Sequence, residues 1–481
     1  MSASRLISRS LGRQAPRIQN LRKPTFPLRT LATPVQTTRY ADPVTHTSTL
    51  SNGLSISSET IPGMSTSSVA LYIDAGSRAD KMTASGAAHF LEHLSFKGTS
   101  TRNQNQLELE VENLGATLNA YTSREQTAFQ AHSFDKDVPK MVEILADITQ
   151  NSKLDAAAVN REKDVILREA EDVATNHTET LFDHLHSVAF QRQPLGNTIL
   201  GPESHIRNMT RDHLQDFINT NYTADRMCLV GAGGISHEEL VKLAEKNFGS
   251  LPSSPNPIPL GGASRPAPVF TGAEVRVRDD TMNTLHVAIA VEAVGWRSPD
   301  YWPMLVMSAV FGNWDRGLGA SPLLSSKLSH IISSNNLANS YQHFFTNYSD
   351  TGLWGVNLIT ENLMNVDDLV HFTLREWTRM SVAPTVAEVE RAKSQTKAAQ
   401  LLVLDGTNAI ADDIGRQMVT IGKRYTPKEV ERYVDAVTPE DIKRVALKYL
   451  WDKDIALAAI GRTEGLLDYS RIRADMSSMI Y

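Results

Sequence analysis

Apolar residues recur along this chain with two different periods. Short apolar or alternating runs bounded by turn residues predict strands over residues 50–58, 68–73, 116–122 and 127–134. Apolar residues spaced three or four apart predict helices over residues 83–96 and 104–114, and one long helix over about residues 156–190. Strand and helix patterns are interleaved, so we predict an α+β fold with helices packed on antiparallel-rich sheets.

A proline-rich segment over residues 251–268 divides the chain into halves of similar length. It has no helical period, which is typical of a linker. Across it, a helix start at Thr210 resembles one at Thr438, a shift of 228 residues, and residues 159–163 resemble residues 389–393, a shift of 230. Two matches at nearly one shift indicate a duplicated unit. We therefore predict two homologous domains, over residues 43–250 and 269–481.

The first 31 residues are basic, whereas the rest of the chain is acidic. They carry a formal charge of +7 and no acidic residue, while the total of −6 leaves −13 for residues 32–481. A basic, serine-rich leader with arginines four apart is typical of a mitochondrial transit peptide, and it lacks the apolar region of a secretory signal. A nucleic-acid-binding arm is the alternative for the same basic run. Since the acidic body offers no second basic patch, we expect no nucleic-acid partner.

Two further features limit the class of protein. The only cysteine, Cys228, excludes an internal disulfide and a cysteine-based zinc finger, and its apolar neighbours predict a buried strand position. The longest apolar stretches, such as residues 302–311, have about half the length that crosses a bilayer.

The sequence His89-Phe90-Leu91-Glu92-His93 lies inside the first predicted helix. Four residues make just over one turn, so both imidazoles project from one face, and Glu92 points to the same side. This is the H-x-x-E-H order of an inverted zincin, in which two histidines bind zinc and the glutamate accepts a proton from the attacking water. The alternative is an ordinary amphipathic helix with two chance histidines, because the short pattern alone has a real false-positive risk.

A catalytic zinc needs a third protein ligand, and the long predicted helix offers one. Glu162 and Glu169 are two turns apart and share a face. At a shift of 230 residues, the second half carries Ala392 and Ala399 at these positions. The half that carries the two carboxylates also carries the two histidines. A helix with a purely structural role would not require this difference between the halves. A solvated glutamate face is the alternative.

Three segments of the first half resemble the pitrilysin-type (M16) metallopeptidases: residues 89–98, 118–125 and 164–169. The resemblance continues in the second half at residues 350–355 and 413–417 and covers essentially everything after the leader. These motifs are far more specific than H-x-x-E-H alone. Within the family they look most like subunits that remove presequences from imported mitochondrial proteins, and that in many fungi are also a core subunit of ubiquinol–cytochrome c reductase.

The resemblance implies a role for each residue of the predicted metal site. His89, His93 and Glu169 would bind one zinc ion per chain. Glu92 would be the general base, and Glu162 would orient one of the metal ligands.

The resemblance also implies how substrate is held. The strand containing Asn119 and Ala120 would pair with an extended peptide, and Glu179 and Asp183 would meet the arginine of a presequence near its cleavage point. An exposed acidic pair one turn apart is also common without such a role. The family usually has a glutamate where this chain has Ala174, a departure that bears on substrate preference more than on activity.

A partner and a location follow from the same resemblance. The chain is about half as long as a self-contained family member with a closed chamber, so we expect a homologous noncatalytic subunit (α-type, or core 2 protein). The substrate would be a basic presequence, and the location the mitochondrial matrix or the matrix face of the inner membrane. One alternative is a structural core subunit, bound to other subunits of ubiquinol–cytochrome c reductase and without significant turnover. Another is a degrader of free peptides.

Overall fold

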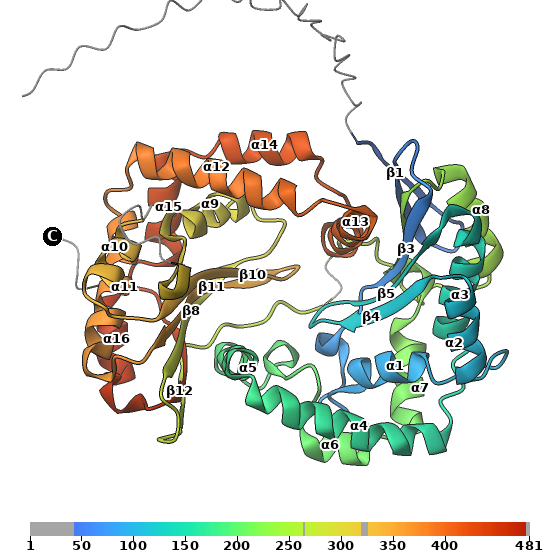
Figure 1. The fold of residues 1–481 in the computed structure, drawn as a ribbon, viewed down its shortest axis with the longest axis horizontal. Helices are drawn as coiled ribbons and strands as arrows, with labels where there is room; N and C mark the ends of the chain where they lie inside the picture. The colour runs from blue at the N-terminus through green and yellow to red at the C-terminus, as the bar shows by residue number, and fades with distance from the viewer. Residues whose placement is uncertain (1–42, 263–264, 319–325, 478–481) are drawn as a thin grey trace, which may run out of the picture. The chain divides into compact units, whose positions relative to one another are not determined.

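The computed structural model describes residues 43–262, 265–318 and 326–477, so the predicted leader lies outside the described residues. The described chain is an α+β fold with two six-stranded sheets, in the orders β1-β2-β6-β3-β5-β4 and β7-β12-β8-β11-β10-β9 (Figure 1). Each sheet has one parallel pair, β2 with β6 and β7 with β12, and otherwise antiparallel pairs. Among these residues, every helix is too short or too polar to cross a membrane.

The first half, up to the linker, contains the first sheet and eight helices among the described residues. In chain order these are β1 Thr45–Thr49, β2 Ser55–Thr60, β3 Thr66–Ile73, α1 Ala87–Ser95, α2 Gln104–Asn113, β4 Thr117–Thr122, β5 Thr127–Phe134, α3 Val138–Gln150, α4 Ala156–Thr175, α5 His177–Ala189, α6 Glu203–Asn208, α7 Arg211–Asn221, β6 Met227–Gly233 and α8 His237–Phe248.

Apart from β1 in the first half and β9 in the second, the second half repeats this succession. It consists of β7 Glu274–Arg278, β8 Leu285–Val294, α9 Tyr301–Phe311, β9 Asn313–Asp315, α10 Lys327–Ser334, β10 Ser340–Asn347, β11 Thr351–Thr360, α11 Val366–Met380, α12 Val386–Leu402, α13 Thr407–Ile421, α14 Pro427–Asp435, α15 Pro439–Tyr449, β12 Ala456–Gly461 and α16 Tyr469–Asp475. By order, α9 corresponds to α1, α12 to α4 and α13 to α5. The predicted fold class and its two related halves are therefore confirmed.

Each sheet buries both faces, one against helices of its own half and the other against a helix of the other half. On the first sheet, Leu71 and Leu229 face the core with α3 and α8, whereas Ala70 and Val230 face α13. On the second sheet, Ala288 and Ala458 face α5. The two halves thus exchange equivalent helices, and Figure 1 shows α13 beside β3 and β5.

The exchanged helix α13 approaches the first sheet closely. A Cβ atom at Gly415 would lie 2.1 Å from the ring of Tyr72, so only glycine fits there. The Tyr72 hydroxyl donates to Asp412 Oδ1 at 2.9 Å, and the Tyr121 hydroxyl donates to the same oxygen at 2.8 Å. Cys228 lies fully buried in β6, as predicted, and burial raises the pKa of its thiol to about 12.

The prediction of one helix over residues 156–190 is wrong. The chain forms two helices, α4 and α5, separated at Asn176, whose backbone is extended. The Asn176 side chain accepts hydrogen bonds from the backbone N–H groups of Thr178 and Glu179 and so starts α5 as its N-cap. This break lets α4 pack on α1 while α5 turns to the second sheet.

Candidate metal centre

The N-terminus of α1 is fixed by a buried carboxylate and a glycine. Gly86 has a positive φ of 95°, and a Cβ atom there would lie 2.3 Å from the carbonyl oxygen of Leu200. Asp80 accepts hydrogen bonds from the backbone N–H groups of Gly86 at 2.7 Å and Ala88 at 3.0 Å. It thereby satisfies two N–H groups that have no partner within the helix. The first turn of α1, which carries His89, is held in a defined direction.

His89, His93 and Glu169 come together between α1 and α4. His89 Nε2 lies 3.5 Å from Glu169 Oε1, and His93 Nε2 lies 3.2 Å from Glu169 Oε2. One donor atom of each residue lies within 4.8 Å of the others, and this is the only such group of potential metal ligands among the described residues. The sequence predicted these three residues as ligands, and the structure brings them together.

The donor set fits a metal ion such as zinc. Two imidazole nitrogens and one carboxylate oxygen, with a position left for water or substrate, are the ligands of many catalytic zinc sites. Among the described residues, Glu169 Oε2 and His89 Nδ1 are buried without a hydrogen-bond partner. The neighbouring imidazoles of His89 and then His93 hold the pKa of Glu169 far below its usual range, so its carboxylate is ionised and ready to bind a cation.

Glu162 lies on the other side of His93, one layer out from these three residues. Its Oε2 is 3.4 Å from His93 Nδ1 and its Oε1 is 3.0 Å from Lys97 Nζ, and the carboxyl group is buried. Burial lowers the pKa of His93, but Glu169, then Glu162 and Glu92, outweigh it and raise that pKa overall. Glu162 is therefore placed to hold a proton on Nδ1 and leave Nε2 facing Glu169.

Glu92 is half-buried on α1 and stands outside the group of potential ligands. Glu92 lies close enough to interact electrostatically with the buried Tyr222. Burial raises the pKa of the Tyr222 hydroxyl, and the charge of Glu92 raises it further. A carboxylate next to a metal centre but not part of it can accept a proton from an attacking water.

Asn119 and Ala120 lie on β4, which is an edge of the first sheet. Within the described residues no strand pairs with its outer side, and β4 lies against α1, the helix of the two histidines. An edge strand beside the centre has free backbone groups that can pair with an extended peptide.

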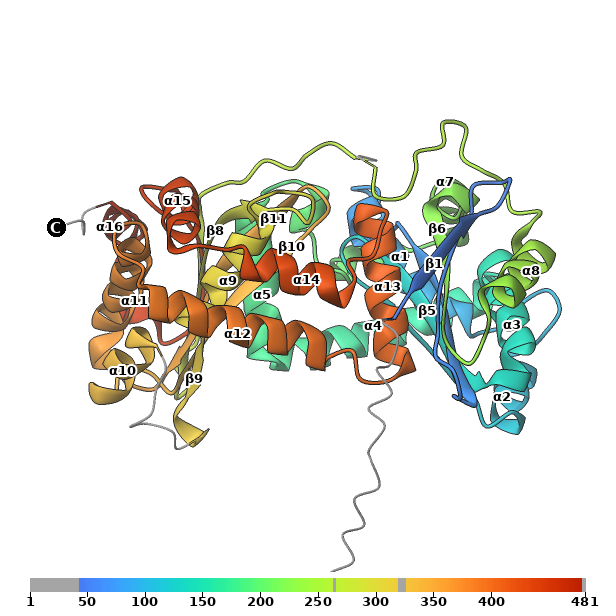
Figure 2. The same ribbon diagram turned by 90° about the horizontal axis from the view of Figure 1, so that it is seen from above.

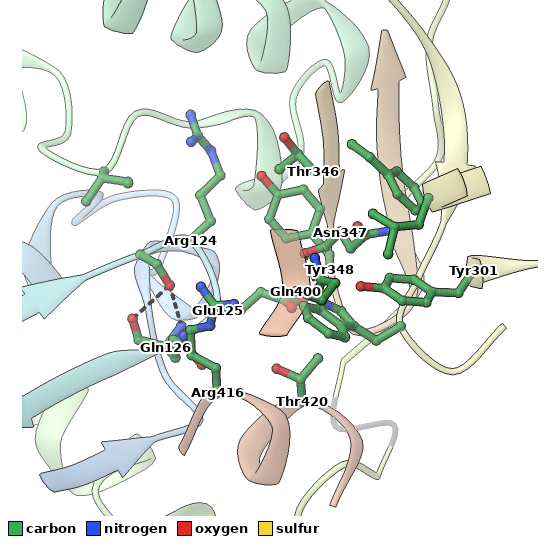
Figure 3. A pocket seen from close by; sticks show the side chains of 15 residues that line it. Arg124, Glu125, Gln126, Tyr301, Thr346, Asn347, Tyr348, Gln400, Arg416 and Thr420 are labelled. Carbon is green, nitrogen blue, oxygen red and sulfur yellow. Dashed lines mark hydrogen bonds between the residues drawn. The ribbon is translucent and has the colours of Figure 1, made fainter. Parts of the chain in front are cut away.

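Glu179 and Asp183 lie one turn apart on α5, as predicted. Glu179 is exposed, whereas Asp183 forms an ion pair with Arg124, whose Nη2 lies 2.6 Å from Asp183 Oδ1. Arg124 comes from the turn between β4 and β5 and borders a cavity of about 430 Å³ between the halves (Figure 3).

Sequence analysis did not identify three side chains that organise this region. Lys97 has the sequence position of a cation at a helix end, Arg124 that of a turn residue, and neither position indicates its partner. Arg78 is buried and joins the halves: it binds both oxygens of Asp350, at 2.8 and 2.9 Å, and Glu125 at 2.6 Å. These partners are up to 272 residues apart, so spacing could not reveal them.

Two family models match the chain. The model of insulinase (peptidase family M16) matches residues 55–203, and that of the peptidase M16 inactive domain matches residues 208–396. The first match contains His89, Glu92, His93, Glu162 and Glu169.

Curated relatives share much of the sequence. The chain is 64% identical over 446 residues to the mitochondrial-processing peptidase subunit beta of Lentinula edodes, covering 92% of this chain and 96% of the relative. It is 55% identical to the protein of that name in Neurospora crassa, with 90% and 91% covered, and 48% identical to that of Saccharomyces cerevisiae, with 90% and 95% covered.

Among solved structures, a chain of complex III2 from Candida albicans with Inz-5 bound is similar in fold. The TM-score is 0.80 at 28% sequence identity, and the match covers 90% of this chain and 99% of that one.

Proposed function

Because this chain belongs to the M16 family of metallopeptidases, we propose that it is the catalytic β-type subunit of a mitochondrial processing peptidase. It hydrolyses one peptide bond in an imported precursor and so removes the presequence. The observation that carries this proposal is the convergence of His89, His93 and Glu169 between α1 and α4. Relatives at 48% to 64% identity bear the name of that subunit.

In this proposal each residue of the centre has a distinct task. His89, His93 and Glu169 hold one zinc ion, which supplies a Lewis acid for the scissile carbonyl group. Glu92 takes a proton from the attacking water and passes it to the leaving amine. Glu162, buried between His93 and Lys97, keeps the His93 ring oriented.

The substrate is an extended basic presequence. Its backbone pairs with the outer edge of β4 at Asn119 and Ala120, beside α1. The acidic pair Glu179 and Asp183 on α5 attracts the arginine that precedes the cleavage point. A homologous noncatalytic α-type subunit closes the site from the other side.

The chain works in mitochondria, on the matrix side, after losing its own leader. Arg29 lies three residues before Ala32, so we expect the mature chain to begin near Ala32. Mass spectrometry of the N-terminal peptide from mitochondria tests this expectation. A mature chain that begins at Met1 or Ser2 contradicts it.

A second function is a core subunit of respiratory complex III, with α-type and other subunits of that complex as partners. The similarity in fold to a chain of the Candida albicans complex favours it. The identity to that chain is 28%, against 48% or more to the named peptidase subunits above. The potential zinc ligands are all retained, so we place peptidase activity first and treat the scaffold role as compatible with it.

The direct test is cleavage of a synthetic presequence peptide by this chain co-purified with its α-type partner. We expect one cut at a fixed site, found by mass spectrometry, and no cut in an acidic peptide of equal length. Glu92→Gln should lower kcat by roughly 100- to 10,000-fold while the complex stays assembled, because the amide accepts no proton. Equal turnover by wild type and Glu92→Gln would overturn the assignment, and random cleavage of both peptides would instead indicate a degrader of free peptides.

A further inference from the structure

The two acidic residues on α5 are not equivalent. Glu179 is exposed, and its carboxylate accepts a hydrogen bond from Asn176 Nδ2 at 2.9 Å, which leaves most of its acceptor capacity to solvent. The Asp183 side chain is 28% exposed and is already bound to the guanidinium of Arg124, which is 11% exposed. In the free chain, Asp183 is therefore already paired with Arg124 before any substrate binds.

Arg124 is held by few contacts for a buried arginine. A guanidinium has five N–H donors. In the part of the chain that the structure describes, the Arg124 guanidinium makes one hydrogen bond, which goes to Asp183. Its Nε is buried without a partner. The adjacent Glu125 binds other groups: its Oε1 accepts from Arg78 and from the Ser349 hydroxyl, and its Oε2 accepts from the Ser349 backbone N–H.

Two other side chains close to Arg124, His186 and Tyr348, are weaker acceptors than a carboxylate. His186 is buried, and burial followed by the charge of Arg124 lowers its pKa well below the usual range, so it is neutral. The Tyr348 hydroxyl bonds to His186 Nε2 at 2.7 Å. Among the described residues, Asp183 is thus the one hydrogen-bond partner of the Arg124 guanidinium.

Arg124 also has space into which it can turn. The cavity of about 430 Å³ that it borders carries neutral polar side chains, among them Thr346, Asn347 and Thr420. It is also lined by Glu125 and by Arg416, whose charge faces Asp412 at 3.7 Å. Figure 3 shows Arg124 and Tyr301 on opposite sides of this cavity. Amide and hydroxyl oxygens accept hydrogen bonds from a guanidinium, so the displaced side chain would remain solvated.

We propose that Arg124 is a specificity-determining residue that stands in for the substrate arginine: it binds Asp183 in the free enzyme and turns into the cavity when a presequence arginine takes its place. The proposal rests on the proposed function and deepens it. A substrate without arginine leaves the Arg124–Asp183 pair intact, so the half-buried Asp183 always keeps a partner of opposite charge. Arg124 therefore weakens binding of arginine substrates and makes substrates without that arginine acceptable.

The test compares two peptides that differ only at the arginine before the cleavage point, one with arginine and one with citrulline, which keeps the shape without the charge. The enzyme is the full complex with its α-type partner. For Arg124→Met we expect KM for the arginine peptide to fall about two- to fivefold, the size of a partly exposed ion pair. KM for the citrulline peptide should stay the same or rise, and kcat should change little for either peptide.

Matched variants separate this role from a structural one. Arg416→Met removes another arginine that lines the same cavity and pairs with Asp412, not with Asp183, so it should leave the ratio of the two KM values unchanged. Arg124→Lys keeps a charge but loses the planar fork, so it should change the ratio in the same direction by a smaller factor. It also serves as the test if Arg124→Met does not fold, which thermal unfolding will show.

Equal changes in KM for both peptides, or a higher KM for the arginine peptide, would overturn the role of Arg124. Failure of the wild-type complex to cleave either peptide would instead count against the proposed function itself. The two failures are therefore distinguishable.

Discussion

The two halves of this chain repeat one succession of helices and strands but fill the space between one pair of helices differently. Between α1 and α4 of the first half lie His89, His93, Glu162 and Glu169. Between the corresponding helices α9 and α12 of the second half, the position that matches Glu162 is Ala392, which is fully buried in the apolar core.

The second half shows what this architecture does without a centre. Its helix α9 is almost entirely apolar, and eight of its eleven residues are buried: Tyr301, Trp302, Pro303, Met304, Val306, Met307, Val310 and Phe311. The fold therefore forms with an ordinary packed core at this place. The difference indicates that the fold does not need the polar residues of the first half for packing at this place.

The largest expected effect comes from removing the polar residues that distinguish the first half. His89→Ala with His93→Ala should reduce processing below about one thousandth of wild type, because the Lewis acid contributes several kcal/mol to the transition state. Assembly with partner subunits should persist, since assembly depends on wide surfaces. A complementation strain is scored for uncleaved precursors and for respiratory complex on native gels, with the exposed His330→Ala in α10 as control. Normal processing would make the centre vestigial, and loss of assembly with soluble protein would show that the centre helps to build the partner surface.

A second prediction concerns the exchanged helices, where the halves should behave alike. Leu185 on α5 and Ile414 on α13 are each fully buried against the sheet of the other half. Leu185→Ala and Ile414→Ala should each lower the free energy of unfolding by about 2–5 kcal/mol. Denaturant unfolding should keep a single transition in both variants, while the exposed Ser187→Ala should change little. Separate melting of one half would contradict the exchange.

A third prediction sharpens the contrast between α4 and α12. Glu162→Gln should weaken metal affinity by about 10- to 100-fold, because the amide holds the Nδ1 proton of His93 less firmly. Competition with a chelator measures this affinity. Glu390→Gln breaks an ion pair with Lys393 on α12 and should have no such effect. Equal metal affinity in Glu162→Gln and Glu390→Gln would show that Glu162 does not support metal binding.

The smallest expected effect concerns Asp300, at the N-terminus of α9. Burial raises the pKa of its carboxyl group, but Lys448, Arg444 and Tyr449 outweigh burial and lower that pKa to about 2. The stabilisation of the folded chain by the ionised Asp300 is therefore present above about pH 4, and it is lost as the pH falls towards 2. Asp300→Asn should cost about 1–2 kcal/mol at pH 7, less than the full shift because the cations are exposed, and the deficit should narrow below pH 4.

A carboxyl group near the N-terminus of α1, that of Asp80, should show the opposite slope. Burial raises the pKa of Asp80 to about 7, although hydrogen bonds from Gly86 and Ala88 oppose the shift. The folded chain then keeps a proton that the unfolded chain releases above about pH 4, so stability relative to Asp80→Asn should fall between pH 4 and pH 7. Denaturant unfolding of metal-free protein measures how the effect of Asp300→Asn and of Asp80→Asn on stability changes with pH. Changes in the same direction for both variants would contradict this prediction.

Much of the architecture could be predicted from the sequence because it depends on local signals. The strands over residues 116–122 and 127–134 appear as β4 and β5, and Thr210 and Thr438 both start helices as N-caps. The three potential metal ligands were predictable because the helical period fixes the face of His89 and His93, and the shift between the halves marks Glu162 and Glu169. The resemblance to the M16 family then assigned Glu169 as the ligand.

Other features depend on contacts that no local pattern reports. An apolar helix face does not say which sheet it covers, so the exchange of α5 and α13 had no signal. The break at Asn176 was hidden because the apolar period continues on both sides of it. Arg124 and Asp183 are 59 residues apart, and their pairing changes the interpretation of the acidic pair.

The central claim is that only the first half holds a catalytic metal, through residues distinct from the base. Metal analysis of the purified complex tests it most directly, in wild type, His93→Ala and Glu92→Gln. We expect about one zinc per complex in wild type and in Glu92→Gln, and almost none in His93→Ala. Equal zinc in all three proteins would contradict the account, because the metal would then lie elsewhere than between α1 and α4.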